Sequence, residues 1–518
     1  QTQAQTPEVL VSMLLALLGF ILGALLVLIL YGPLRSTLRR LLFPRVSRCD
    51  TNPRAWDVAQ RQHEAVIDLH ERHQSAVVRT ASDVVWVRGA AARQVLSGAR
   101  GVFCECQWDV KGRVAAVSNL VQPMYYHTLF NMVGSEWKAR RKLVSNMFSV
   151  RPGTVRLLLG ACASLRAQLA ATLTDAAQVL DLTDVVHESM QAMMFALCAG
   201  NRFTMTPEHV AVHRKLVVHF VKRYSTVAGA GDNQQIRADD LAVMESALDI
   251  GREAVAHVRA RLAAGESGDQ LGLLGALLAP RGDGASCAVD DREAAETFVN
   301  FVIAGAESPA AALGRTLAEV AARPQMQERM RLELLGEVPS WFLSVGGGAA
   351  APAEPDEQSA PLEQLIAWMR NLPYSTAVFR EGLRRYSPAT VVRRMAHEDT
   401  TLDGEPIAAG TQMCVCIAAA HADQAEWPDA SAFQPERFLS TDGSKLSALP
   451  VGYLPFSRGP RACPGAALTY AISQLLTTLL LNHYRLESTT ESGFAGQRVA
   501  KFVTWHSGGT PVRCTPRQ

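Results

Sequence analysis

A cysteine near the carboxyl end of the chain is the residue whose surroundings point most directly to chemistry. Glycines on both sides would let the backbone curl around its sulfur, and an apolar helical run over 466–481 follows. The positive end of that helix and backbone N–H groups would stabilise a thiolate, so we expect a low pKa for this thiol. The thiolate could attack a substrate or bind a metal, although a lone cysteine before a helix is more often a buried structural thiol. The segment reads Phe456-Ser-Arg-Gly459-Pro-Arg461-Ala-Cys463-Pro-Gly465.

This spacing, Phe-x-x-Gly-x-Arg-x-Cys-x-Gly, resembles the haem-binding loop of the cytochrome P450 family, with all five fixed positions filled. The resemblance implies haem b (iron protoporphyrin IX) as cofactor, with Cys463 as the axial ligand to the iron. It also implies that Phe456, Arg461 and Gly465 belong to the cofactor site.

A tryptophan and two further arginines match positions that bind haem in the family. Trp137 and Arg141 fit a Trp-x-x-x-Arg pattern on an early helix, and Arg394 fits an arginine in the first strand after the Glu–Arg helix. The resemblance implies that these residues and Arg461 bind the haem propionates, because a guanidinium makes bidentate contacts to carboxylates. The neighbouring Arg393 is the alternative to Arg394.

A Glu-x-x-Arg pair, Glu381 and Arg384, lies within a predicted helix over 374–386. The spacing of three places both charges on one helix face, where such a pair is ordinarily an exposed salt bridge worth under about 1 kcal/mol. The family has this pair too, together with an arginine matched by Arg437. The resemblance implies a buried network of the three side chains behind the haem.

The oxygen-side helix of the family is matched in part by residues 304–309. Gly305 and Glu307 fit the family pattern, Ser308 replaces a threonine, and Pro309 replaces the last position. We expect Gly305 to let the backbone approach the haem, and Pro309, which has no N–H, to open the helix. We assign Ser308 as proton donor and Glu307 as proton gateway. The alternative is a solvated glutamate beside a proline kink.

The elements that position these residues are mainly helical, with a minor β region. Apolar residues at three- and four-residue spacing predict helices at 156–173 and 242–263, and Asp290 with Glu293 forms a possible capping box. Short β-type runs lie at 76–87, 390–395, 411–417 and 502–505. We expect one catalytic domain over 55–510, with surface insertions at 228–232 and 346–361 and a tail over 511–518.

The front of the chain predicts a membrane anchor. Residues 9–31 carry no charge and are long enough to cross a hydrocarbon core of about 30 Å. An N-terminal tail, 1–8, precedes them, and an arginine-rich linker, 32–54, follows, which places the catalytic domain on the cytoplasmic or equivalent side. A cleaved signal peptide is the alternative. We favour the endoplasmic reticulum, with a mitochondrial or plastid membrane also open.

Composition excludes several classes of protein. The 518 residues are 48% apolar and 19% charged with a net charge of +2, and no basic tract with interleaved aromatic residues indicates nucleic acid binding. Ten cysteines are too few for a disulfide scaffold in a chain of this length.

The resemblance implies a haem-thiolate monooxygenase that hydroxylates a lipophilic small molecule. Its electrons would come from an NADPH-dependent flavoprotein reductase or a ferredoxin, with Lys138, Arg140 and Lys142 as a possible docking patch. Two alternatives stay open: a P450-fold enzyme that rearranges or dehydrates a peroxide without external electrons, and an accessory subunit of a membrane complex. The segments expected to line the substrate pocket are 103–130, 215–224, 391–392 and 502–505.

Overall fold

The computed structural model describes most of the expected catalytic domain. The described residues are 62–81, 84–97, 103–104, 129, 132, 134–173, 178–227, 238–280, 289–345, 360–389, 391–490, 498–499, 505–506 and 509–517. The predicted anchor and linker, the insertion at 228–232 and nearly all of the one at 346–361 lie outside them, as does most of the pocket segments 103–130 and 502–505.

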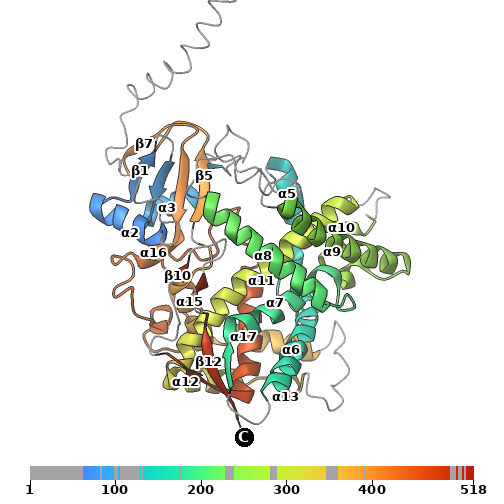
Figure 1. Ribbon diagram of the computed structural model, residues 1–518. Helices are drawn as coiled ribbons and strands as arrows, with labels where there is room; N and C mark the ends of the chain where they lie inside the picture. Colours follow the sequence, from blue (N-terminus) through green and yellow to red (C-terminus); the bar gives the residue numbers. More distant parts are fainter. Residues whose placement is uncertain are drawn as a thin grey trace, which may run out of the picture.

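Helices make up most of the domain and gather around one long central helix (Figure 1). That helix, α11, runs from Asp291 to Ala321 and is buried on nearly all sides, as its apolar sequence requires. The other principal helices are α2 (Gln62–His73), α3 (Gly89–Ser97), α5 (Gly134–Ser145), α6 (Pro152–Thr172), α7 (Leu182–Ala199), α8 (Pro207–Val227), α9 (Ala238–Ala263), α10 (Gly272–Leu278), α12 (Pro324–Gly336), α14 (Ala360–Arg370), α15 (Pro373–Arg385), α16 (Ile417–Ala422) and α17 (Ala466–His483).

The main sheet lies to one side of the helices and has the strand order β1-β2-β8-β5-β3 (Figure 1). Three of the four predicted β runs form its strands: β1 and β2 are the predicted run at 76–87, and β5 and β8 are the next two. β2 pairs with β8 in parallel, and β5 with β8 in antiparallel register. The strands are β1 (Val77–Ala81), β2 (Val84–Val87), β3 (Phe103–Cys104), β5 (Val391–Ala396) and β8 (Gln412–Cys416).

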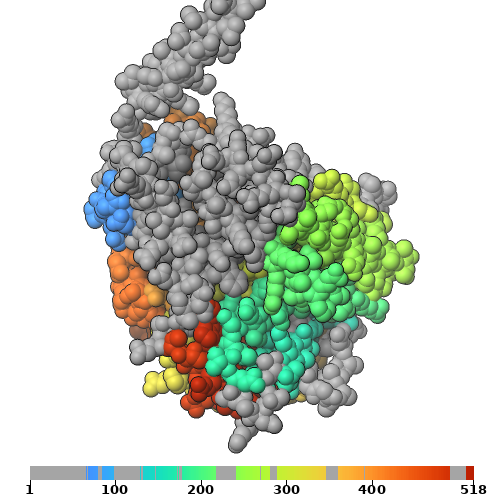
Figure 2. All heavy atoms as spheres, in the orientation of Figure 1, coloured from blue at the N-terminus to red at the C-terminus, as the bar shows by residue number. Residues whose placement is uncertain are grey.

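The prediction of a tail at 511–518 was wrong, because these residues contain a strand of a second sheet. Strand β12 (Pro511–Pro516) pairs with β4 (Gln178–Asp181) on one side and with β9 (Tyr484–Ser488) on the other. Val512 and Cys514 point inward and are buried, which is the alternation of a half-buried strand. In Figure 2 the red C-terminal residues lie beside blue-green residues at the lower edge of the molecule.

The remaining described strands form two small ribbons, β6 (Thr400–Leu402) with β7 (Glu405–Ile407) and β10 (Arg498–Val499) with β11 (Trp505–His506). The mainly helical fold with small sheets agrees with the prediction. Within the part of the chain that the structure describes, none of the helices combines the length and the apolar character needed to cross a membrane.

Candidate active site

The cysteine loop folds back on itself just before α17. Cys463 N–H donates to the Phe456 carbonyl at 2.9 Å, and Ala462 N–H donates to the Gly459 carbonyl at 3.0 Å. Gly459 has a φ of +77°, and a Cβ added there would lie 2.3 Å from the Leu96 carbonyl oxygen. The loop therefore needs glycine at 459, both for its backbone conformation and for its contact with α3.

The Cys463 sulfur lies at the mouth of α17 and is accessible to water. Even so, burial within the surrounding protein raises the pKa of its thiol, against the lowering effects of the Gly465 N–H and of Arg141. The expected low pKa was therefore wrong for the thiol itself, because desolvation exceeds the two favourable contributions. Coordination to a metal ion is what would deprotonate this thiol.

Gly465 leaves space beside this sulfur. Its φ is −84°, and an added Cβ would meet only the Cys463 sulfur and the Phe148 ring, both at 3.8 Å. The glycine is thus not required by its backbone conformation, unlike Gly459. Phe456, at the start of the loop, packs on Tyr470 of α17, with 5.7 Å between the two ring centres.

Two arginines share the space next to the cysteine. The Arg461 guanidinium lies 4.3 Å from the centre of the Trp137 ring and donates to the Leu129 carbonyl at 3.0 Å and to the Met132 carbonyl. Desolvation lowers the pKa of Arg141, with Cys463 opposing the shift and Arg461 adding to it. The charges of these side chains therefore act on one another.

Arg394 lies on the predicted strand, β5, and is buried, with Nη1 donating to the Arg393 carbonyl at 2.8 Å. Cys463, Arg141 and Arg461 act on one another electrostatically, and a thiol accompanied by guanidiniums suits an iron porphyrin with two carboxylates. The residues present therefore fit haem, and the part expected of Arg394 stays a prediction.

Glu381, Arg384 and Arg437 come together, and we call these three residues the Glu–Arg network. Arg384 donates to both Glu381 oxygens at 2.7 Å, and both side chains are fully buried. The remaining donors of Arg384 bind the carbonyls of His421 and Ala430 at 2.8 and 2.9 Å.

Arg437 joins this network less directly than expected. Its Nε lies 3.6 Å from Glu381 Oε1, without hydrogen-bond geometry, and its outer nitrogens donate to the Pro428 and Asp429 carbonyls at 2.5 and 2.7 Å. Glu381 Oε1 instead accepts the Gln434 N–H at 2.9 Å. Arg437 thus holds the loop before it, and the carboxylate belongs chiefly to Arg384.

The start of α11 departs from the predicted capping box. Asp290 accepts the Glu293 N–H at 2.7 Å, but the Glu293 carboxylate does not return to Asp290. It binds Arg140 in a bidentate ion pair at 2.5 and 2.9 Å, which ties α5 to α11. Arg140 is therefore engaged, while Lys138 and Lys142 are exposed on the same helix.

The middle of α11 departs from expectation at Pro309, while the approach of Gly305 to haem stays a prediction. A Cβ on Gly305 would lie 2.4 Å from the Met194 sulfur, so this glycine allows close packing of α11 against α7. The helix also continues unbroken through Pro309. Ser308 is partly exposed, and its hydroxyl donates to the Ala304 carbonyl at 2.8 Å, within the helix.

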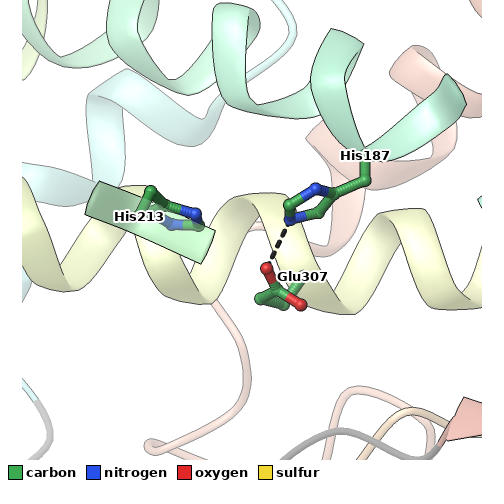
Figure 3. A group of neighbouring side chains, drawn as sticks. All are labelled: His187, His213 and Glu307. Atoms are coloured by element: carbon green, nitrogen blue, oxygen red, sulfur yellow. Dashed lines mark hydrogen bonds and ion pairs between the residues drawn. The ribbon is translucent and has the colours of Figure 1, made fainter. Parts of the chain in front are cut away.

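Glu307 is almost fully buried, and its partner was not predicted. Its Oε1 is hydrogen-bonded to Nε2 of His187, which comes from α7 (Figure 3). His213 of α8 lies beside the pair, with its ring centre 5.8 Å from that of His187. We call these three residues the His–Glu pocket. Histidines on otherwise apolar helix faces were the sequence signal that could have indicated it.

Comparison with known proteins gives one family. The family model described as Cytochrome P450 matches residues 98–497. Over 227 residues the chain is 30% identical to thromboxane-A synthase of Rattus norvegicus, covering 44% of this chain and 38% of that protein. It is also 30% identical over 214 residues to an ultra-long-chain fatty acid omega-hydroxylase of Homo sapiens, covering 40% and 36%. Each alignment thus spans less than two fifths of the relative.

Among solved structures, a cytochrome P450DA heme domain superposes with a TM-score of 0.69 at 16% identity. The superposition covers 92% of this chain and 97% of that one. At this identity the likeness concerns the fold, which extends over nearly the whole chain.

Proposed function

Because the chain belongs to the cytochrome P450 family, which binds haem b, we propose that it is a membrane-anchored monooxygenase that hydroxylates a lipophilic small molecule. The observation that carries the proposal is the cysteine loop, which places Cys463 at the mouth of α17 beside Arg141 and Arg461. The acid and hydroxyl of Glu307 and Ser308 lie on the central helix α11. The first group of residues can hold iron, and the second can move protons.

When bound, haem would supply the redox chemistry that reduces and splits dioxygen. The Cys463 sulfur would hold its iron, and Arg141, Arg394 and Arg461 would hold its carboxylates. Trp137 would keep Arg461 in place by the stacking contact already described.

Glu307 and Ser308 would deliver the protons that oxygen cleavage consumes. The two side chains are adjacent on α11, and the half-exposed Ser308 hydroxyl is the one nearer to solvent-accessible space. His187 holds the Glu307 carboxylate by a direct hydrogen bond and so can pass a proton to it. Ser308 would have to release the Ala304 carbonyl in order to donate.

Electrons would come from a flavoprotein reductase or a ferredoxin. Lys138 and Lys142 are the exposed part of the expected docking patch, because Arg140 binds Glu293. The membrane position rests on the uncharged residues 9–31, and the homology to a fatty acid hydroxylase supports a lipophilic substrate.

One experiment tests the activity and separates it from its rival. Purified protein is reconstituted with a flavoprotein reductase, and oxygen uptake, NADPH oxidation and product are measured with a panel of fatty acids. We expect substrate-dependent consumption of NADPH and oxygen in equal amounts. Reduced protein with carbon monoxide should show a Soret band shifted far to the red, and Cys463→Ala should abolish it. No oxygen uptake with any substrate would contradict the proposal.

The rival is rearrangement or dehydration of a peroxide without external electrons. It is favoured by the bond from the Ser308 hydroxyl to the Ala304 carbonyl and by the similarity to thromboxane-A synthase. A hydroperoxide or endoperoxide converted stoichiometrically without NADPH would establish this activity instead.

A further inference from the structure

The His–Glu pocket is built like a metal site. Its side chains come from three helices, α7, α8 and α11, and each offers one ligand atom within 4.8 Å of the other two (Figure 3). The exposed fractions are 6% for His187, 5% for His213 and 2% for Glu307. In the part of the chain that the structure describes, no other group of three His, Cys, Asp or Glu residues meets this condition.

Several buried polar atoms here lack partners. Glu307 Oε2, His213 Nε2 and Gln191 Oε1 have no hydrogen bond to any described residue. A buried polar atom without a partner costs about 1–3 kcal/mol, so three of them in one pocket require an explanation. A cation between the carboxylate and the imidazoles would satisfy the first two atoms together.

Gln191 lies one turn along α7 from His187 and can orient the imidazole of His213. Its side-chain amide contacts His213 Nδ1. Oxygen and nitrogen of an amide are nearly indistinguishable, and a 180° rotation would place Oε1 at His213 Nδ1. Nδ1–H would then donate to an amide oxygen, and Nε2 would keep a lone pair. A carbonyl-type acceptor behind a ligating histidine is the usual support of such a ligand.

We propose that His187, His213 and Glu307 bind a divalent transition-metal ion, with Zn²⁺ the best match. Two imidazoles and one carboxylate with an open fourth position form a common zinc ligand set. Zn–N distances of about 2.0–2.1 Å place tetrahedral ligands about 3.4 Å apart. The His187–Glu307 contact must therefore open, and the ligand atoms, which all lie within 4.8 Å of one another, must settle near this spacing.

The charges favour a cation. Desolvation, with a smaller contribution from His187, lowers the pKa of His213 to about 3, so this ring is neutral and its nitrogen is available at physiological pH. Metal binding would also have a consequence that rests on the proposed function. A carboxylate held by zinc cannot carry protons, so zinc would inhibit turnover.

The first test measures zinc in the haem-loaded full-length protein, in which iron occupies Cys463. The protein is dialysed against buffered ZnCl₂, and zinc per haem is determined by mass spectrometry. We expect one zinc per haem for the wild type and for His397→Gln, a control at an exposed histidine. His213→Gln and Glu307→Gln should weaken binding at least about tenfold. Unchanged binding in both variants, or none in the wild type, would overturn the proposal.

The second test needs no variant. X-ray absorption at the zinc edge of the wild type should show two imidazoles and oxygen ligands, whereas sulfur or a single imidazole would place the ion elsewhere. Turnover is then compared with and without zinc. Bound zinc with unchanged turnover would leave the metal site standing and contradict the role of Glu307 in proton transfer.

Discussion

The Glu–Arg network and the His–Glu pocket are both buried clusters of charged or titratable groups, but they treat their polar atoms differently. In the network, Arg384 binds both oxygens of Glu381 and three main-chain carbonyls. In the pocket, Glu307 Oε2 and His213 Nε2 bind none of the described residues. The Glu381–Arg384 pair at the centre of the network is saturated by the protein, and only Nε of the peripheral Arg437 lacks a hydrogen bond to a described residue. The His–Glu pocket instead leaves atoms of its central carboxylate and of one imidazole without partners.

This difference indicates that the Glu–Arg network stabilises the fold, whereas the His–Glu pocket can take part in chemistry. A saturated buried ion pair is rigid, and removing one partner leaves an uncompensated charge. A pocket with unused polar atoms is less stable but can take up a proton or a cation. Substitutions in the first cluster should therefore change stability, and substitutions in the second should change activity.

The largest expected effect is loss of stability in Glu381→Gln. The substitution strands the Arg384 charge in the core, so we expect a loss of about 3–5 kcal/mol in the free energy of unfolding. Urea denaturation of the haem-loaded protein measures it. The control is Glu436→Gln, which breaks an exposed pair with Arg329 at 3.5 Å and should cost under about 1 kcal/mol. Equal losses in the two variants would remove the distinction.

Glu307→Gln should lower activity strongly and change stability little. We expect turnover with the reductase to fall about 100-fold, because the proton gateway is lost, with peroxide released instead of product. Asp291→Asn, at an exposed acid on the same helix, is the control. The free energy of unfolding should change by less than about 2 kcal/mol. Normal turnover in Glu307→Gln would assign proton delivery to another group.

His70 extends the comparison to a buried imidazole away from both clusters. Its Nδ1 lies 2.8 Å from the Ser75 carbonyl, and burial lowers its pKa to about 4. As the pH falls, the imidazole of His70 is protonated in the unfolded chain before it is protonated in the folded protein. The free energy of unfolding therefore falls as the pH drops from 6.5 toward 4. Between pH 8 and pH 5 the loss should be about 2 kcal/mol. In His70→Asn this part of the pH dependence should vanish, as denaturation at both pH values would measure.

The smallest expected effect concerns the Arg140–Glu293 pair. It is bidentate but half-buried, so a double-mutant cycle with Arg140→Gln and Glu293→Gln should give a coupling of about 1–2 kcal/mol. Lys138→Gln is the control and should leave stability unchanged while raising the KM for the reductase. A coupling near zero would mean that the pair does not hold α5 to α11.

Motifs with fixed local spacing were predicted well from the sequence. Glu381 and Arg384 lie one helical turn apart, and the cysteine loop closes over eight residues, so helix geometry and turn chemistry decide both. The partners of Glu307 and Glu293 could not be predicted in this way. His187 and Arg140 lie 120 and 153 residues away in sequence, and only the packing of helices brings them together.

The surroundings of individual side chains also could not be predicted from the sequence. The motif indicated a helix and glycines around Cys463, but the desolvation that raises the pKa of its thiol comes from all of the surrounding protein. The close contact of Gly305 with Met194 of α7 could not be predicted, because the sequence does not show which helix faces this glycine. The strand at 511–516 was detectable, since Val512 and Cys514 alternate with polar residues.

The pairing of β12 with β4 sets an order of assembly. Pro511 is the register partner of Asp181, 330 residues earlier. During synthesis β4 emerges long before its neighbour exists, and contacts of such large sequence separation form slowly. The edge of β4 that later pairs with β12 therefore stays exposed until the C-terminal residues have been synthesised. Chaperone dependence during translation should concentrate on this edge.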